Sequence, residues 1–275
     1  MNDLIDDVRD HYRAAGLTER LKMALTSLGL GQSDLPLAPR QLAALDQFHT
    51  RGLAATEELG KLAGIIPGMS VLDVGCGIGG PARLLAETYG CRVTGIDLSE
   101  PFIEAARYLT ERTGQSGQVS FRSASALALP FADGAFDMAL LQHVAMNILD
   151  RELLYREIRR VLKPGGRFAT FDVVAKTGEP IYPVPWARTP ATSFLLTAEQ
   201  TREAIIAAGF HPLAWLDDTE AAKAWIAKLR ESGPPPMPNL GLVMGPDFAQ
   251  FVQNLGRNLM EGRVGVVTGL FDAAA

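Results

Sequence analysis

The chain has 275 residues, of which 47% are hydrophobic and 21% charged, a balance that excludes an intrinsically disordered protein. Its 26 Lys and Arg against 31 Asp and Glu leave a net charge of -5, so it lacks the basic excess typical of proteins that bind nucleic acid. The two cysteines, Cys76 and Cys91, show no metal-ligand spacing, and no apolar run approaches the length that spans a bilayer. We therefore expect a cytoplasmic protein with reduced thiols, no metal, and neither a nucleic-acid nor a membrane partner. The oligomeric state stays open.

The first 66 residues show helical spacing, because leucines recur three or four positions apart over residues 17–28 and in part of a second run over residues 42–59. From residue 69 onward short apolar runs alternate with helical stretches. Strands are expected at 69–74, 92–96, 119–121, 136–141 and 167–174, and helices at 81–88, 100–113 and 151–162. This alternation predicts a parallel sheet with helical crossovers.

The alternation is interrupted after the fifth strand by residues 176–194, which contain four prolines and have no clean period. Thr197 and Gln200 form a capping box that opens a helix ending near Gly209, and a sixth strand is expected at 211–216. We expect a second irregular piece after it, then a helix at 246–260 and a last strand at 264–271. The predicted organisation is a helical region at 1–66 and an α/β domain at 67–275, with insertions at about 176–194 and 217–262.

The most informative segment is a strand that runs into a glycine-rich turn containing Gly75, Gly77 and Gly80. Glycines there let the backbone approach a ligand, and this spacing taken alone is also that of a dinucleotide-binding loop. Asp97 ends the next strand, where a carboxylate suits hydrogen bonding to both hydroxyls of a ribose. The loop therefore predicts a nucleoside-containing cofactor.

Five motifs in register resemble a class I S-adenosylmethionine-dependent methyltransferase: Asp73 to Gly79, Asp97, Leu129 to Phe131, Phe136 to Asp137, and Leu162 to Gly166. The resemblance implies a Rossmann-like three-layer sandwich, a seven-stranded, mostly parallel sheet with an antiparallel last strand, and an N-terminal helical lid. It implies S-adenosylmethionine as cofactor and S-adenosylhomocysteine as product. Its implied cofactor residues are Asp73, Gly75, Cys76 and Gly77 in the loop, Asp97 at the ribose, Leu98 on the adenine, and Ser125 with Ala126 where many relatives carry an Asp.

The fourth predicted strand ends in polar residues at the edge of the sheet, beside the expected methyl group. Gln142 is a cofactor candidate and Asn147 a substrate candidate, whereas His143 is a candidate general base or a positioning hydrogen-bond partner. Elsewhere, further candidates are expected over the cofactor and in the acceptor pocket. They are Phe48, His49 and Arg51 in the lid, and Tyr182, Trp186 and Arg188 in the first insertion.

The resemblance favours the group of sarcosine and dimethylglycine N-methyltransferases, with quinone and tocopherol C-methyltransferases also similar. We therefore expect methyl transfer to a small molecule, with an amine favoured. The alternatives are O- or C-methylation of a phenolic, quinone or natural-product ring, a non-catalytic protein that binds S-adenosylmethionine, and a nicotinamide-dependent oxidoreductase.

Overall fold

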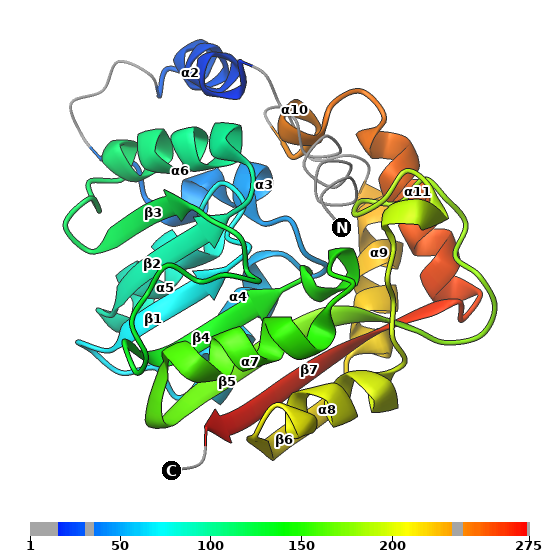
Figure 1. The fold of residues 1–275 in the computed structure, drawn as a ribbon. Helices are drawn as coiled ribbons and strands as arrows, with labels where there is room; N and C mark the ends of the chain where they lie inside the picture. Colours follow the sequence, from blue (N-terminus) through cyan, green and yellow to red (C-terminus); the bar gives the residue numbers. More distant parts are fainter. Residues whose placement is uncertain (1–15, 31–35, 233–238, 274–275) are drawn as a thin grey trace.

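The computed structural model describes residues 16–30, 36–232 and 239–273. A single seven-stranded sheet runs through it in the order β3-β2-β1-β4-β5-β7-β6 (Figure 1). All pairings are parallel except those of β7, which runs antiparallel to both β5 and β6. The predicted mostly parallel sheet with an antiparallel last strand is confirmed. The strands are β1 (Ser70–Val74), β2 (Arg92–Asp97), β3 (Val119–Ser123), β4 (Phe136–Gln142), β5 (Leu162–Ala175), β6 (Phe210–Asp217) and β7 (Val264–Ala273).

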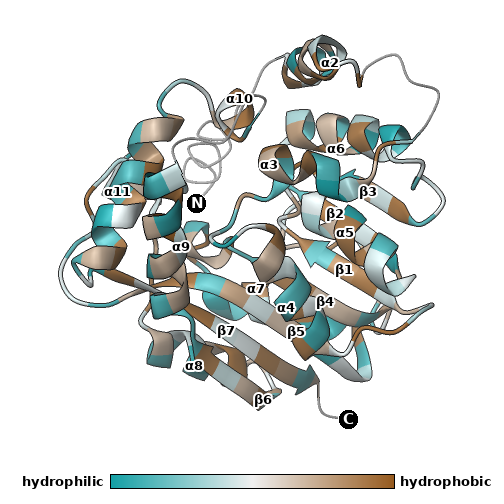
Figure 2. Cartoon of the chain, turned by 180° about the vertical axis from the view of Figure 1, so that it is seen from behind, coloured by the Kyte–Doolittle hydropathy of each residue, from teal (hydrophilic) through white to brown (hydrophobic). Residues whose placement is uncertain are grey.

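Helices cover both faces of the sheet and make three layers. One face carries α4 (Leu53–Ala63), α5 (Gly80–Tyr89), α9 (Thr219–Ser232) and α11 (Phe248–Met260), and the other carries α7 (Arg151–Val161) and α8 (Ala198–Ala207). Successive residues of β1 divide between the layers, since Val71 packs in the first core and Leu72 and Val74 in the second. Figure 2 shows the apolar colouring of the strands between these helices.

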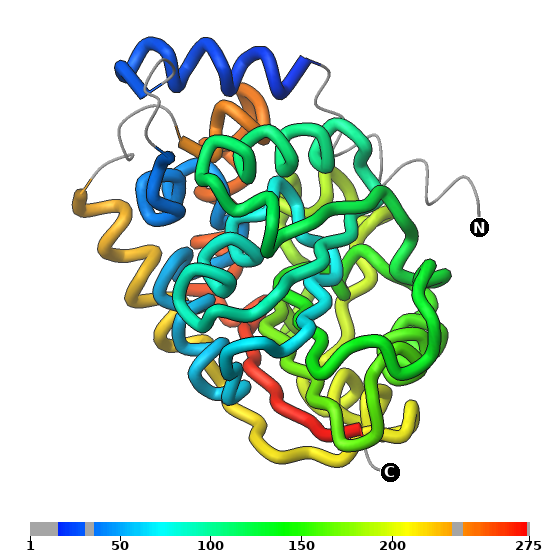
Figure 3. The backbone as a smooth tube through the Cα atoms, turned by 90° about the vertical axis from the view of Figure 1, so that its left-hand side faces the viewer, coloured from blue at the N-terminus to red at the C-terminus, as the bar shows by residue number. Residues whose placement is uncertain are grey.

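The N-terminal elements form a separate layer above the sheet. They are α2 (Leu17–Ser27), the 3₁₀ helix η1 (Pro39–Leu42) and α3 (Ala43–Asp46), and they share an apolar cluster with α6 (Glu100–Arg112) and α10 (Gly241–Met244). Leu21 and Leu42 are fully buried there, next to Phe102 and Val243. Figure 3 shows α2 lying across the top of this layer. Segments from the two ends of the chain therefore meet over one region of the sheet. Two further 3₁₀ helices are η2 (Ala145–Asn147) and η3 (Pro190–Thr192).

Two local expectations were wrong. Residues 219–232, expected to be irregular, form helix α9, because Ala222 and Ile226 repeat at helical spacing and are buried in the core. Asp217 Oδ1 accepts from the backbone N–H of Thr219, the first residue of that helix, over 2.9 Å. Strand β5 begins at Leu162 rather than at residue 167, because Leu162 pairs with Phe136 through a register shift.

The described residues contain neither a metal-binding cluster nor a membrane-spanning helix. In the described ranges, no group of three or more His, Cys, Asp or Glu side chains could hold a metal ion. No helix of these ranges combines the length and the apolar character needed to cross a bilayer.

Candidate cofactor and acceptor site

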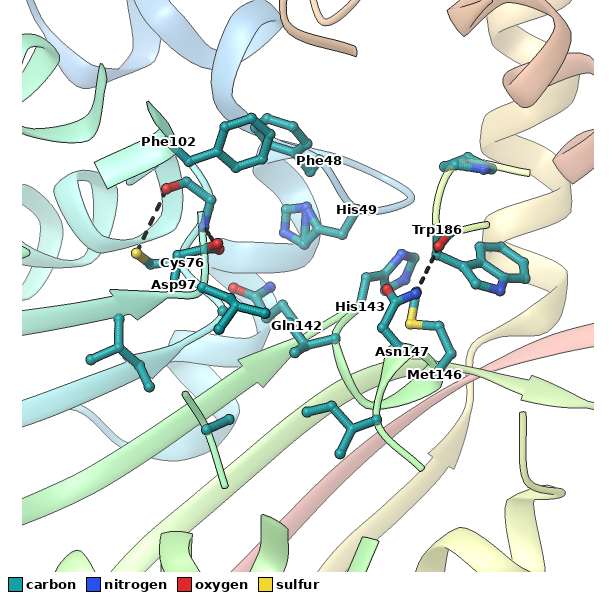
Figure 4. A pocket seen from close by; sticks show the side chains of 18 of the residues that line it. Phe48, His49, Cys76, Asp97, Phe102, Gln142, His143, Met146, Asn147 and Trp186 are labelled. Carbon is teal, nitrogen blue, oxygen red and sulfur yellow. Dashed lines mark hydrogen bonds between the residues drawn. The ribbon is translucent and has the colours of Figure 1, made fainter. Parts of the chain in front are cut away.

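A cavity of about 240 Å³ opens at the carboxyl ends of β1, β2 and β4, beside the point where the strand order reverses. Its walls come from the glycine loop, the turn between α3 and α4 (residues 47–52, here the α3–α4 turn), the segment after β5, and α10 and α11 (Figure 4). Many residues singled out from the sequence line it. These are Phe48, His49, Asp73, Gly75, Cys76, Gly77, Asp97, Leu98, Ser125, Ala126, Gln142, His143, Asn147 and Trp186.

The glycine loop is hydrogen-bonded to the end of β2 and has no room for a side chain at Gly75. The backbone N–H groups of Gly75 and Cys76 both donate to Ile96 O, over 2.8 and 2.9 Å. Gly75 has φ of +75°, and a Cβ there would lie 2.3 Å from Val144 Cγ2. Glycine is therefore required at this position for both conformation and space. Burial raises the pKa of the Cys76 thiol well above its usual range, so Cys76 is a neutral wall residue.

The two acidic residues of the loop region have different surroundings. Asp97 Oδ2 accepts from Gly77 N and Oδ1 from Ser99 N, both over 2.9 Å, so each oxygen keeps one lone pair for a hydroxyl group. Asp73 is 2% exposed, and no described residue donates to its Oδ2. Burial, with the nearby charge of Asp97, raises the pKa of Asp73 to about 7. The site thus holds an uncompensated buried carboxyl group.

The end of β4 carries the polar residues of the cavity floor. Within the described chain, neither amide atom of Gln142 has a hydrogen-bond partner, although the residue is only 9% exposed. Asn147 Nδ2 donates to Trp186 O and Thr192 O over 2.7 and 3.1 Å, so Asn147 fastens the segment after β5 to the sheet. His143 is partly exposed and lines the cavity, and burial, together with the nearby His49, lowers its pKa well below the usual value.

The α3–α4 turn places a second histidine beside His143. The His49 and His143 rings meet edge to face with centroids 6.1 Å apart, and burial lowers the pKa of His49 to about 3. Phe48, from the same turn, packs on Phe102 with ring centroids 5.7 Å apart. In Figure 4 these aromatic residues lie above the cavity, opposite Asp97 and Gln142. Both imidazoles are therefore neutral at physiological pH.

Asp46, at the end of α3, connects the α3–α4 turn to the glycine loop through a buried ion pair with Arg83. Arg83 of α5 is completely buried and donates to Asp46 Oδ2 and to Ile78 O, each over 2.8 Å. The turn is also in tight backbone contact, because a Cβ on Gly80 would lie 2.2 Å from Asp46 O. No sequence pattern predicts this role for Asp46, since only the fold brings Arg83 beside it.

Three residues predicted at the site lie outside the cavity lining. Arg51 pairs with Glu58 on α4. Arg188 pairs with Asp247 over 2.7 Å, and Tyr182 packs, partly buried, against the core beneath α11. Of the first-insertion candidates, only Trp186 reaches the cavity, where it is 2% exposed and donates from Nε1 to Ser193 Oγ over 2.9 Å.

An apolar wall that sequence reasoning did not resolve completes the cavity. It comes from the segment after β5 and from the region of α10 and α11. The sequence predicted these segments only as insertions in the α/β domain. Its members are Pro185, Trp186, Phe194, Leu240, Met244, Phe248 and Leu255, with Met146 and Leu149 from the loop after β4. Helical spacing of apolar residues over 240–255 is the signal that could have identified it.

Residues 72–170 match a family model described as a methyltransferase domain. Over this segment the chain has the sequence of a methyltransferase domain. The methyltransferase GfsG of Streptomyces halstedii is 38% identical over 134 residues, which are 49% of this chain and 48% of that protein. The O-methyltransferase resE of Aspergillus sclerotiorum is 42% identical over 118 residues, which are 43% of this chain and 45% of that protein. The chain spans about half the length of such curated relatives, or less.

Solved structures extend the likeness across the whole methyltransferase fold. The 4+2 cyclase SpnF is 27% identical over 81% of both chains, with a TM-score of 0.67. A geranyl diphosphate C-methyltransferase from Streptomyces coelicolor A3(2) matches 100% of this chain and 99% of its own with a TM-score of 0.72, and its 21% identity shows a shared fold alone. Because one neighbour is titled a cyclase, the fold by itself does not determine the reaction.

Proposed function

We propose that the protein transfers a methyl group from S-adenosylmethionine to a small apolar acceptor and releases S-adenosylhomocysteine. The observation that carries the proposal is the pair of unpartnered buried groups, Asp73 Oδ2 and the Gln142 amide, beside a glycine loop that a Cβ would fill. A buried carboxyl without a partner is costly, and a bound cation compensates it. The amino group and the sulfonium of the cofactor are such cations.

Different residues of the chain hold different parts of this cofactor. Asp97 offers lone pairs to the ribose hydroxyls, and Asp73 faces the methionine end. Leu98 and Ala126 supply apolar walls for the adenine, while Ser125 Oγ, which accepts from Leu127 N over 3.2 Å, retains a proton to donate. When bound, the cofactor supplies an electrophilic methyl group. The chain excludes water and aligns the acceptor with that group.

The acceptor end of the cavity supports an apolar molecule with an oxygen or carbon nucleophile. Trp186, Met244 and Phe248 belong to a wall without formal charge, whereas Arg188, the expected carboxylate clamp, is engaged with Asp247. A zwitterionic amine such as sarcosine or dimethylglycine would leave its carboxylate facing this wall, at a large desolvation cost. The curated relatives include O- and sterol C-methyltransferases, which supports the same preference.

The proposal is tested by calorimetric titration with S-adenosylhomocysteine and, as a control, with NADH. Turnover is then measured as S-adenosylhomocysteine release with three probes: 2-naphthol for oxygen, menadiol for carbon and dimethylglycine for nitrogen. We expect binding of S-adenosylhomocysteine but not of NADH, and turnover with the apolar probes. Binding without turnover on any probe would favour a non-catalytic binding protein or another reaction, and turnover of dimethylglycine alone would overturn the apolar acceptor.

Matched variants separate the acceptor wall from the cofactor site. Met244→Glu places a charge in the wall, so it should lower kcat/KM for the reactive apolar probe at least about tenfold while S-adenosylhomocysteine affinity stays unchanged. Met260→Glu is the control, because Met260 lies on α11 outside the cavity lining and is 56% exposed. Equal effects of the two substitutions would contradict the assignment of the wall.

A further inference from the structure

His143 is held between the sheet and the α3–α4 turn. Its Nε2 lies 3.3 Å from Oγ1 of Thr50, a residue that is only 2% exposed. Its ring stacks on Phe171 of β5 with centroids 5.0 Å apart, and its backbone N–H donates to Phe171 O over 2.7 Å. The imidazole is therefore gripped from the sheet and from the N-terminal layer together, and it lines the cavity between them (Figure 4).

Two residues at or beside this contact, His143 and the residue that follows Thr50, have backbone conformations in the left-handed region. In the described ranges, only two residues other than glycine have a positive φ: Arg51, at 64°, which follows Thr50, and His143, at 54°. Such conformations are unfavourable for residues with a Cβ, and they gather where function holds them in place. Their occurrence at a single contact indicates that Thr50 and His143 are placed for more than packing.

A chain of hydrogen bonds with assignable directions fixes the turn. Thr56 Oγ1 donates to Gln47 Oε1 over 2.9 Å. That bond uses the only hydroxyl proton of Thr56. His49 Nε2, 2.8 Å from the same oxygen, must therefore donate to it. His49 is thus a fixed neutral tautomer, and its ring packs edge-on against His143, next to Thr50.

We propose that Thr50 is a positioning residue for His143, and that their contact makes His143 the general base for a hydroxylated acceptor. This inference rests on the proposed methyl transfer. Nε2 and Thr50 Oγ1 lie 3.3 Å apart. In the tautomer that this proposal requires, Nε2–H donates to Thr50 Oγ1, so the lone pair of the neutral imidazole lies on Nδ1. Thr50 thus acts as the third group, which orients the base toward the nucleophile.

The proton and electron balance is complete without any further reactant. The acceptor O–H bond breaks and its proton passes to His143 Nδ1, while the oxygen forms the new bond to the methyl carbon. The electron pair of the broken C–S bond stays on sulfur, so the positive charge passes from the sulfonium to the imidazolium. The Nε2–H bond to Thr50 persists and stabilises that imidazolium.

The test compares Thr50→Val, which removes the hydroxyl and keeps the shape, with Thr50→Ser, which keeps the hydroxyl. In ¹⁵N-labelled protein saturated with S-adenosylhomocysteine, two-bond proton–nitrogen correlations report which nitrogen of His143 carries the proton, and His143→Gln assigns the signals. We expect one Nε2-protonated tautomer in the native protein and in Thr50→Ser, and a mixture in Thr50→Val. An unchanged tautomer in Thr50→Val, or Nδ1 protonation in the native protein, would overturn the proposal. Thr50→Ala replaces Thr50→Val if circular dichroism shows that the latter does not fold.

Kinetics give a second readout with the oxygen probe that turns over. Thr50→Val should lower kcat about tenfold or more, Thr50→Ser should restore most of it, and KM for S-adenosylmethionine should not move. An equal loss in both variants would contradict the role of the hydroxyl. Since the tautomer is measured without turnover, an inactive protein with the expected tautomers refutes the methyl transfer, whereas an active one with unaltered tautomers refutes the role of Thr50.

Discussion

Replacing Asp73 by Asn should stabilise the ligand-free protein and weaken its binding of S-adenosylhomocysteine. The carboxyl is 2% exposed, and burial together with Asp97 raises its pKa from 3.8 to about 7. At about 1.4 kcal/mol for each pKa unit, the ionised form costs roughly 4 kcal/mol. The amide keeps the shape without the charge, but its NH₂ group is also buried without a partner. We therefore expect a net gain of about 2 kcal/mol at pH 8.

The sign of the pH dependence follows from the raised pKa. Between pH 3.8 and about 7 the folded protein holds a proton on Asp73 that the unfolded chain has lost. The contribution of this group to stability is thus fully present below the lower value and is lost as the pH rises through the upper one. The advantage of Asp73→Asn over the native protein should therefore be about 2 kcal/mol at pH 8 and should fall to about zero near pH 5, where the cost of ionising Asp73 is only about 1.7 kcal/mol.

Urea unfolding at the two pH values measures the stabilities, and calorimetry measures the affinity. Losing the carboxylate partner of the cofactor's amino group should weaken S-adenosylhomocysteine binding at least about tenfold. Asp137→Asn is the control, because at Asp137 the effect of burial is outweighed by hydrogen bonds from Lys163 and Ser70, which lower its pKa. That variant should be less stable at pH 8. A loss of stability in Asp73→Asn at pH 8, a gain that does not vary with pH, or an unchanged affinity would each refute the reasoning.

Three further predictions concern the loop, the buried ion pair and a helix cap. Gly75→Ala should weaken S-adenosylhomocysteine binding at least about tenfold in calorimetry, because its Cβ would meet Val144; Gly165→Ala, with φ of +72° and open space around it, is the control that should bind normally. Arg83→Met should lower the free energy of unfolding by about 3–5 kcal/mol by leaving Asp46 buried and unpaired, and a loss below about 1 kcal/mol in urea unfolding would contradict that pairing. Thr197→Ala removes the cap of α8 and should cost about 1 kcal/mol by thermal unfolding, whereas Thr197→Ser should cost much less.

Elements and loops whose signals are local could be predicted from the sequence. The alternation of strands and helices, the glycine loop and the capping box of α8 depend on residue spacing and on turn chemistry within a few positions. The prediction from local spacing was wrong at residues 219–232. Two buried apolar positions among charged residues form too weak a periodic pattern to indicate helix α9. The antiparallel direction of β7 came from family resemblance, since spacing alone does not set strand direction.

The composition of the site depended on contacts between distant segments. Asp73, Asp97 and His143 could be predicted to line one cavity because each lies at or just after the end of a predicted strand at one edge of the sheet. Three features could not be predicted in this way. They are the pairing of Thr50 with His143, the ion pair of Asp46 with Arg83, and the exclusion of Arg188 from the cavity.

By itself the sequence determined the order of the elements, the glycine loop and the mildly acidic composition of the chain. Only the tertiary structure decided which residues of the α3–α4 turn touch the end of β4, and that α10 and α11 close one side of the cavity with an apolar wall. The physical reason is that spacing and turn chemistry act over a few residues, whereas these contacts join segments 93 residues apart and more, as between Thr50 and His143. Their partners are set by how helices pack over the sheet, which no local pattern specifies.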